Sequence, residues 1–507
     1  MIFAIGVMLI TSLLVFAAFT QTTNDIHLSY RDTLQKKAFL AASTGVQEYE
    51  HKLQVNSDYW EKSCEGPQGT VSGETSESYV TSLLPANTTT TNKSKLCSPA
   101  SPFETMIEKE GPTANTFSVK SVGSAGGVKR TLIATFKVSG FLDFAYFTQY
   151  EDEDPYLTGR PASECERYYE EAGKSRRSER CVYITFTKED SVKGPMHTDD
   201  SALVECSKEV AFGRSGQDDA VEIDRGTYSS GGSEAKGPAS SPCSGTGPTY
   251  NTFSKTFSEG AELLPPESDS SVRAYVEPGY EFTGRTEVTL NGKTMTVTNA
   301  NFHADEPTSV PLPANGLVFV RTGSGGCNYE YLNTSGHSDS SQTDGEEAEC
   351  GSVWVHGTYS ESLTLAAETD VVINGELVPT GVSAGNAPTG TATLGLMATR
   401  FVRIYHPCSF RGNETGSLTN PWIYAAILST SHSFVVDNYD CGNQLGHLNV
   451  YGAIAQKFRG VVGQVGGSGY LKDYLYDERL ATDEPPYFLA PLDAGWMIER
   501  ETAESAG

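Results

Sequence analysis

Hydrophobic and polar residues change their pattern twice along the chain, and the first change lies near residue 20. Residues 1–20 carry no charge, and the first charged side chain is that of Asp25. About 20 apolar residues are needed to cross a hydrocarbon core of ~30 Å. The stretch is therefore long enough for a transmembrane helix.

Helical character continues beyond this apolar run. No proline occurs before residue 55, and apolar residues recur at three- and four-residue steps, which is typical of an amphipathic helix. These residues are Leu34, Ala38, Ala41, Ala42, Val46, Tyr49 and Leu53. We predict one helix over residues 2–55, ~80 Å long at ~1.5 Å per residue. A secretory signal peptide fits less well, because the apolar run is long, has no basic segment before it and continues into the amphipathic pattern.

The second change, after the helix, is to alternating apolar and polar residues. Residues 116–123 and 127–138 alternate in this way across a glycine turn, which predicts a β-hairpin. We expect the hairpin to pack on the amphipathic half of the helix. Together with the polar loops before it, the hairpin would form a small head over residues 56–139.

Short apolar segments separated by Gly, Pro, Asn and Asp follow from residue 140. Between residues 351 and 404 they recur at irregular steps, at 353–355, 363–365, 371–373, 394–396 and 402–404. Short parallel rungs of a β-solenoid explain these triplets best, and a two-sheet β-sandwich is the alternative. The predicted fold class is α+β, mainly β, with a long amino-terminal helix.

The chain is expected to divide into four parts: a helix (1–55), a head (56–139), a β-rich domain (140–480), and a strap and tail (481–507). In the last part, residues 485–489 and Trp496 would close over the last rung and protect its edge from pairing with another chain. Residues after Arg500 are expected to be frayed.

Composition excludes some functions and supports the β assignment. Among 507 residues, 64 acidic residues outnumber 37 lysines and arginines, which gives a net charge of −27. Such a surface repels phosphate groups, so sequence-independent binding of nucleic acid is excluded as a function. The many glycines, prolines, tyrosines and phenylalanines favour strands and turns over helices.

Ten cysteines indicate disulfides in an oxidising compartment. They are Cys64, Cys97, Cys165, Cys181, Cys206, Cys243, Cys327, Cys350, Cys408 and Cys441. None form a Cys-x-x-Cys pair, which excludes zinc knuckles and thioredoxin-like motifs. We favour pairing of neighbours in sequence order, although spacing alone leaves the connectivity open. Free buried thiols in a cytosolic protein are the alternative.

A half-apolar, half-amphipathic helix that opens a β-rich domain resembles the helix of type IV pilins. Residues 39–49, Phe-Leu-Ala-Ala-Ser-Thr-Gly-Val-Gln-Glu-Tyr, make it similar to PilX-type minor pilins. Ile5 stands where major pilins carry a glutamate, which suits the PilX-type group. Several later segments (141–148, 194–200, 352–359, 425–428 and 433–438) resemble the extracellular part of large uncharacterised bacterial proteins that carry the same kind of helix.

The resemblance implies that the helix inserts into a membrane or a pilus and that the rest of the chain is exported. Disulfides require the carboxyl-terminal part to lie outside, yet Arg31, Lys36 and Lys37 lie on that side of the apolar run. Basic residues are usually retained on the cytoplasmic side. We therefore expect a basic leader upstream of Met1 in the native protein.

The residues of this sequence best suited to metal binding or catalysis are His197, Asp199 and Asp200, because an imidazole beside carboxylates can bind a divalent metal or act as a base. Adjacent residues of a strand point to opposite faces, so only some of these side chains can converge. A turn in which Asp199 accepts backbone N–H bonds is the preferred interpretation.

Other polar clusters are expected to be solvated loops. They are the acidic runs 151–154 and 218–219, the segment around Asp344 and Gly345, which fails the EF-hand pattern, and the glycine-rich stretch 460–469. The last one lacks the following lysine and helix of a phosphate-binding loop.

These patterns predict a non-enzymatic surface protein, a minor or tip pilin-like subunit with an adhesive or assembly role. No catalytic, cofactor-binding or metal-binding residue is assigned, and no cofactor is expected. The expected partners are membrane lipid or other pilin-like subunits through the helix, and a surface glycan or protein through the β domain. It would be a single-pass membrane protein with an extracellular β domain, or part of a pilus. The alternatives are a surface-tethered β-helix enzyme acting on polysaccharide and a carbohydrate-binding module.

Overall fold

The structure is a computed structural model of the chain, and it describes most but not all residues. The described residues are 2–55, 59, 65–71, 77–83, 116–138, 140–169, 177–187, 190–205, 211–214, 217, 219–224, 228–230, 233–236, 260, 262–327, 348–408, 416–464, 466–481, 483–492 and 496–503. The chain divides into two compact units. Unit 1 contains residues 1–110, 114–139 and 495–507, and unit 2 contains residues 111–113 and 140–494. The fold is α+β and mainly β.

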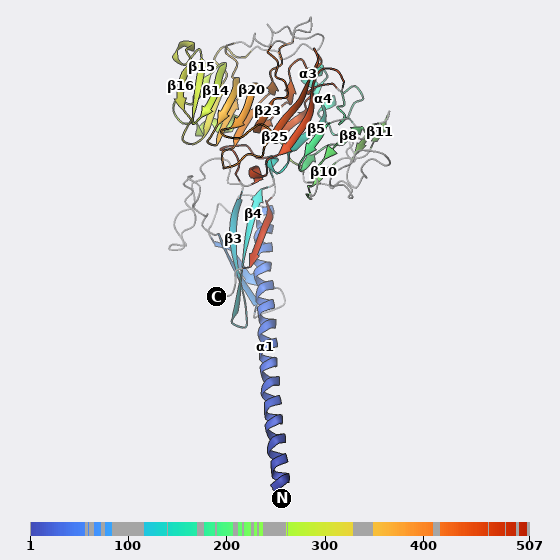
Figure 1. The fold of residues 1–507 in the computed structure, drawn as a ribbon, viewed down its shortest axis with the longest axis vertical. Coiled ribbons are helices and arrows are strands. Elements are labelled where there is room, and N and C mark those ends of the chain that lie inside the picture. Colours follow the sequence, from blue (N-terminus) through green and yellow to red (C-terminus); the bar gives the residue numbers. More distant parts are fainter. Residues whose placement is uncertain are drawn as a thin grey trace. The chain divides into compact units, whose positions relative to one another are not determined.

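Unit 1 is built on a single long helix, α1 (Ile2–Val55), which confirms the predicted helix. In its carboxyl-terminal half, the apolar face predicted from the three- and four-residue steps is buried. Ala42, Val46, Tyr49 and Leu53 pack against side chains of a sheet, including that of Phe136. Figure 1 shows the helix lying along strands β3 (Thr116–Ala125) and β4 (Val128–Val138). Tertiary packing therefore stabilises this half of α1.

The sheet of unit 1 is antiparallel, with the strand order β1-β2-β3-β4-β27. The predicted hairpin is confirmed, since β3 and β4 pair in register around Gly126 and Gly127, both of which have positive φ. The other strands are β1 (Glu65–Thr70), β2 (Glu77–Leu83) and β27 (Trp496–Ala503). The head thus contains more strands than the hairpin that its sequence predicted.

The carboxyl-terminal segment corrects two predictions. Trp496 lies in β27, which pairs with β4, and it packs in the core of unit 1 rather than closing a rung of the β domain. Residues 501–503 belong to the same strand, so they are not frayed. Residues 485–489 do pack onto a core of unit 2, but they lie against Thr364 of β19 and Met397 of β21, inside the ladder, and not over an edge rung as predicted. An unpaired edge of β4 explains the position of β27, because it offers backbone partners to the strand that follows unit 2.

Unit 2 consists of many short strands that pair mainly in parallel. All five predicted apolar triplets lie in strands, in β18 through β22. The strands of the main sheet are β5 (Tyr146–Glu153), β6 (Ser191–Lys193), β7 (Met196–Thr198), β9 (Ala211–Phe212), β10 (Val221–Ile223), β13 (Glu281–Thr283), β14 (Thr286–Gly292), β15 (Thr294–Asn299), β16 (Thr308–Pro311), β17 (Leu317–Arg321), β18 (Val353–Tyr359), β19 (Leu363–Ala367), β20 (Val371–Pro379), β21 (Leu394–Ala398), β22 (Val402–Ile404), β23 (Trp422–Ser429), β24 (Phe434–Val436), β25 (Gln444–Arg459) and β26 (Gly469–Tyr476). A separate small sheet contains β8 (Ala202–Glu205), β11 (Tyr228–Ser230) and β12 (Ser233–Lys236).

From β17 to β25, pairing follows a regular rule, in which a strand pairs in parallel with the next strand but one. Thus β17 pairs with β19, β19 with β21, β21 with β23, and β23 with β25. Beyond β25 the ladder returns to earlier parts of the chain, through β5 and β7 to β10. Figure 1 labels β14, β20, β23 and β25 in this order across the unit, in agreement with the pairing of β14 with β18, β18 with β20, β20 with β23 and β23 with β25.

The parallel ladder has an apolar core on each of its faces. In β19, Leu363, Leu365 and Ala367 belong to the larger core, whereas Ala366 belongs to a second core on the opposite face. The second core also contains Phe147 of β5 and Leu263. Because both faces are covered, the strands read as continuous apolar segments rather than as alternating ones.

Three disulfides are present in the described part of unit 2, and all three join neighbouring cysteines, as predicted. They are Cys165–Cys181, Cys327–Cys350 and Cys408–Cys441. Cys64, Cys97, Cys206 and Cys243 lie outside the described residues.

Candidate functional site

The amino-terminal half of α1 presents an apolar surface that nothing in the described part of the chain covers. Its large apolar side chains are 51% to 71% exposed. They are Ile5, Met8, Leu9, Ile10, Leu13, Leu14, Val15 and Phe16. We call this set the apolar surface of α1. Single exposed apolar residues are ordinary, but a contiguous set of this size is typical of an interaction surface.

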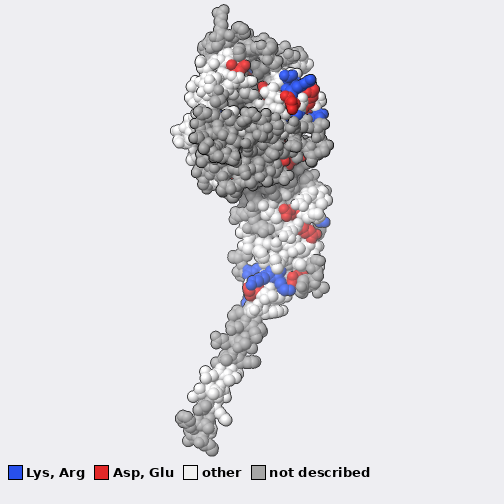
Figure 2. Space-filling view, turned by 90° about the vertical axis from the view of Figure 1, so that its right-hand side faces the viewer, with Lys and Arg blue, Asp and Glu red and all other residues white. Residues whose placement is uncertain are grey.

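The polar side chains within this surface are satisfied by the helix itself. The hydroxyls of Thr11 and Ser12 donate to the carbonyl oxygen of Met8, at 3.1 and 2.7 Å. This pattern lets a hydroxyl enter an apolar environment without losing a partner. On the face drawn in Figure 2, the described atoms at the lower end of the helix are white, so no charged side chain interrupts the apolar surface there. In the part of the chain that the structure describes, no helix has a stretch long and apolar enough to span a membrane.

Charged contacts begin where α1 meets the sheet of unit 1. Lys37 donates to Glu77 of β2 at 2.6 Å, and the Glu77 side chain is nearly buried. The preceding residue, Lys36, pairs with Asp32, about one turn earlier, on the exposed side of the helix. Among the described side chains of α1, the large apolar ones up to Phe16 are exposed, and Ala38 is the first that is fully buried against unit 1.

A second candidate lies in unit 2, where the sequence predicted a constellation around His197. Strand β7 pairs in parallel with β10, and the register places His197 beside Glu222. Side chains that are opposite each other on paired strands lie on the same face of the sheet. Accordingly, His197 Nδ1 lies 2.8 Å from Glu222 Oε2, and His197 Nε2 lies 2.9 Å from Asp199 Oδ1 and 3.7 Å from Asp224 Oδ2.

Neighbouring segments hold this cluster in place. The ring of Phe147, which is paired with His197 in the ladder, stacks on the imidazole at 5.6 Å, and Phe144 lies at 5.1 Å. The backbone N–H groups of Leu263 and Gly260 donate to Asp199 and Asp224, respectively. A Cβ atom on Gly260 would overlap the imidazole of His197, so this close cover requires glycine.

Burial and the carboxylates act in opposite directions on the imidazole. Burial alone would lower the pKa of His197, but hydrogen bonds with Asp199 and Glu222 outweigh it and raise the pKa to about 9. Burial also raises the pKa of Asp199 to about 6, although its bond with His197 works against this rise. Without another cation, the imidazole is thus protonated and bridges two carboxylates.

The third residue of the predicted constellation lies elsewhere. Asp200 points to a different network, in which it pairs with Arg177 and accepts from the backbone N–H of Glu151 at 2.9 Å. Arg177 also pairs with Asp152 at 3.2 Å, and all of these side chains are buried. The prediction that only some of the three residues converge is confirmed. Asp199 also accepts a backbone N–H, as expected, but from the distant Leu263 rather than within a local turn.

The acidic run 151–154 was expected to be solvated, and this is wrong for three of its residues. Glu151, Asp152 and Asp154 are at most 1% exposed. Glu151 pairs with Arg459 at 2.8 Å, and Asp154 with His432 at 2.7 Å. The reason is that the run lies at the end of strand β5, where distant parts of the chain supply partners such as the buried Arg459 and the part-buried His432.

The other clusters predicted to be solvated loops lie only partly within the described residues. Asp219 pairs with Arg214 at 2.6 Å, and Asp218, Asp344 and Gly345 lie outside the described residues. The glycine-rich stretch forms a tight turn, with the N–H of Gln464 donating to the carbonyl of Ser468, and leads into strand β26 rather than a helix.

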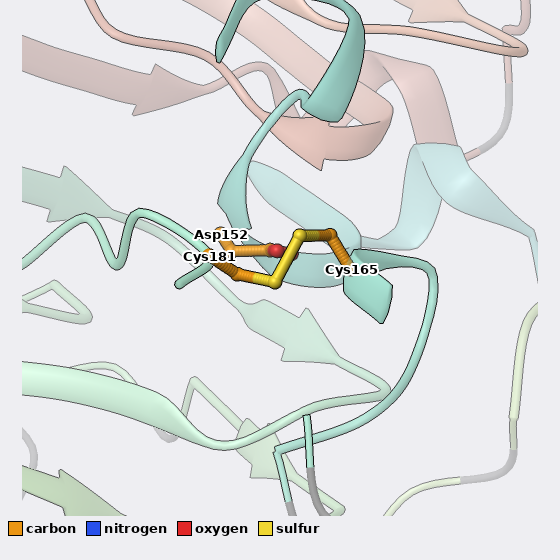
Figure 3. A group of neighbouring side chains, drawn as sticks. All are labelled: Asp152, Cys165 and Cys181. Atoms are coloured by element: carbon orange, nitrogen blue, oxygen red, sulfur yellow. A yellow bond between two sulfur atoms is a disulfide. The ribbon is translucent and has the colours of Figure 1, made fainter. Parts of the chain in front are cut away.

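One group of neighbouring metal-binding residue types is excluded as a metal site by its covalent chemistry. Asp152, Cys165 and Cys181 lie together, as Figure 3 shows. The two cysteines are joined in a disulfide, so neither offers the thiolate that a metal ion requires. Among the described residues, the other such group is His197, Asp199 and Asp224.

Sequence reasoning missed Glu222 and Asp224, which complete the histidine cluster. The segment Val221-Glu-Ile-Asp224 alternates in the same way as Met196-His-Thr-Asp199, with Val221, Ile223 and Met196 in the core. This shared alternation is the pattern that could have paired the two segments, although it does not fix which strands are neighbours.

Comparisons with known proteins give little further guidance. No family model matches the chain, and no curated protein matches it. Among solved structures, the chain is similar to one described as the crystal structure of competence-associated pilin ComZ from Thermus thermophilus. The TM-score is 0.30 at 11% sequence identity, and the match covers 93% of this chain and 98% of that chain.

Proposed function

We propose that this protein is a non-enzymatic surface protein that assembles through α1, as a minor pilin-like subunit or as a membrane-anchored protein. The observation that carries the proposal is the division of α1. Its carboxyl-terminal half is packed in unit 1, whereas its apolar surface is exposed. Apolar surface of this kind is stabilised when helices of other subunits or lipid remove it from water.

The sequence of the packed half supports the pilin-like form of this proposal. Residues 39–49 resemble PilX-type minor pilins, and Gly45 in this segment lies against β2 and β3. A helix packed on an antiparallel sheet by one half only leaves the other half available for contacts between subunits. The proposed role is adhesion or assembly, with the partner helices belonging to other pilin-like subunits.

For unit 2 we propose a β-solenoid as the detailed architecture. Parallel pairing between alternate strands supports it, because successive turns of a coil stack in this way. A β-sandwich would instead pair its strands antiparallel. The exposed surface of the proposed solenoid is where a glycan or protein ligand would bind.

The proposal that the chain is not an enzyme is supported by the ion pairs that its buried carboxylates form. Many buried ones in unit 2 are bonded to cations, including Glu151 to Arg459, and Asp370 and Asp437 to Arg403. Carboxylates paired in this way stabilise a fold, whereas glycoside hydrolysis needs two that face a substrate. The disulfides support export of unit 2 to an oxidising compartment.

Two matched substitutions on α1 test the proposal. Leu14 is 64% exposed in the apolar surface, and Leu40 is 60% exposed in the packed half. Leu14→Lys should release the full-length protein from the membrane or filament fraction, because a charge at mid-span costs ~2.5–3.5 kcal/mol on insertion. Leu40→Lys should leave the distribution unchanged. If Leu14→Lys fractionates like the unaltered protein, the proposed role of the apolar surface is wrong.

A further inference from the structure

The histidine cluster of unit 2 has the composition and spacing of a metal site. One ligand atom each from His197, Asp199 and Asp224 lies within 4.8 Å of the others. Two of these residues are separated by 25 or more positions of chain from the third, so the parallel pairing of β7 with β10 creates the arrangement. The cluster is separate from the apolar surface on which the proposed function rests.

The distances fit coordination by a divalent transition metal. Metal bonds to imidazole nitrogen and carboxylate oxygen are ~2.0–2.2 Å long, which places two ligand atoms of one ion roughly 3 to 3.5 Å apart. His197 Nε2 lies 2.9 Å from Asp199 and 3.7 Å from Asp224. These separations bracket that range, so small side-chain shifts suffice to seat an ion.

Glu222 supplies the orienting bond that such sites use. It lies 2.8 Å from His197 Nδ1, so this nitrogen donates its hydrogen to the carboxylate and Nε2 faces the two aspartates. A carboxylate in this position fixes the tautomer and raises the basicity of a metal-binding histidine. Glu222 is also the most open member of the cluster, at 23% side-chain exposure, and offers a path from solvent.

An unsatisfied atom points to a missing partner. Asp199 is fully buried, and its Oδ2 receives no hydrogen bond from any described residue. A buried carboxylate oxygen without a partner costs free energy, more than a neutral group would. The imidazole already bonds the other oxygen, Oδ1, so a protonated His197 does not relieve this cost.

We propose that His197, Asp199 and Asp224 bind a divalent transition-metal ion, with zinc as the best fit to one imidazole and two carboxylates. The ion binds His197 Nε2, one oxygen of Asp224 and the carboxylate of Asp199 through both oxygens, so that the unpartnered Oδ2 also gains a ligand bond, and any proton on Nε2 is released to solvent. Because Leu263, Gly260 and Phe147 cover the cluster, the ion has a structural role. It joins β7, β10 and the segment around residue 260 at one end of the parallel ladder.

Metal binding by purified full-length protein tests this proposal. The protein is prepared in detergent without a polyhistidine tag, stripped with chelator and titrated with Zn²⁺, with Mg²⁺ in a parallel titration. Calorimetry should show one Zn²⁺ per chain at this site and little binding of Mg²⁺, and Zn²⁺ should raise the unfolding temperature. Co²⁺ should give the visible absorption of a bound ion.

Three variants separate this site from other zinc-binding residues. Asp224→Asn keeps an oxygen that accepts the Gly260 N–H but should lose the Zn²⁺ equivalent, and Glu222→Gln should weaken binding by about 10- to 100-fold. Asp269→Asn, which alters another buried aspartate in unit 2, should bind Zn²⁺ normally. Zn²⁺ binding that is absent in the unaltered protein, or unchanged in Asp224→Asn, would overturn the proposal and leave the cluster as an ion pair around a protonated imidazole.

Discussion

Gly123 in strand β3 lies against the backbone of Ala38 in helix α1. A Cβ atom on Gly123 would lie 2.0 Å from the Ala38 carbonyl oxygen and 2.3 Å from the Ala42 amide nitrogen, far shorter than van der Waals contact. Ala38, Ala41 and Ala42 are fully buried at this contact. Small residues on both sides therefore allow the backbones of helix and sheet to approach closely.

Gly123→Val should destabilise unit 1 by about 1–3 kcal/mol or more, because backbone atoms cannot move aside as a flexible side chain can. Ser124→Val is the matched control, since adjacent positions of a strand face opposite ways. Thermal unfolding followed by circular dichroism would measure both variants. Equal unfolding temperatures for the two variants would show that the close approach does not limit stability.

Glu151 and Arg459 form a buried ion pair, and Arg459 also stacks on Phe186 at 3.5 Å. Arg459→Met alone should lower the free energy of unfolding by about 3–5 kcal/mol, because it leaves the buried charge of Glu151 without a partner. Glu151→Gln alone should lower it by a similar amount, because a neutral amide compensates the charge of Arg459 only weakly. The double variant should lose less than the sum of the single variants. A double-mutant cycle by chemical denaturation measures this coupling, and strictly additive losses would contradict it.

Asp269 makes stability depend on pH. It is fully buried, and burial raises its pKa to about 8, against a hydrogen bond from Thr399 at 2.8 Å. A pKa raised above its unfolded value of ~3.9 means that the folded state holds the proton more tightly. The stability from this group is fully present below about pH 4 and is lost as pH rises through 8.

The measurement for Asp269 compares the unaltered protein with Asp269→Asn, which stays neutral. Between pH 5 and pH 9 the free energy of unfolding of the unaltered protein should fall by up to about 4 kcal/mol more than that of the variant. Parallel pH profiles would show that Asp269 does not titrate in this range. Glu368, the nearby acidic group that also raises the pKa of Asp269, is unchanged in both proteins.

The Cys165–Cys181 disulfide closes a short loop beside Asp152. Replacing both cysteines with alanine should cost about 3 kcal/mol for a loop of 16 residues. In intact cells, these two cysteines should resist maleimide labelling until a reductant is added. Labelling of both thiols without reductant would contradict export to an oxidising compartment.

Local patterns of the sequence predicted the elements that depend on local order. The three- and four-residue steps predicted α1, and alternation around Gly126 and Gly127 predicted the β3–β4 hairpin. Neighbouring cysteines paired as their order suggested wherever the structure describes them. In each case the partners lie close together along the chain, so few alternatives compete.

Contacts between distant segments could not be predicted in this way. Glu151 was expected to be solvated because the acidic run fits no calcium-binding loop, and its partner Arg459, 308 residues away, leaves no trace in the local sequence. Glu222 lies beside His197 only because two three-residue strands, β7 and β10, pair with each other. Strand β27 pairs with β4 although the whole of unit 2 lies between them in the sequence. Register between strands of similar alternation is set by the completed fold, and one sequence does not reveal it.

The position of β27 gives the protein a built-in order of maturation. Unit 2 is inserted in the chain between β4 and β27, so a ribosome delivers all of unit 2 before the strand that finishes the sheet beneath α1. Nascent or truncated chains would hold the helix on an incomplete platform, with the edge of β4 bare. Only a chain synthesised through β27 has the complete five-stranded sheet against which α1 packs.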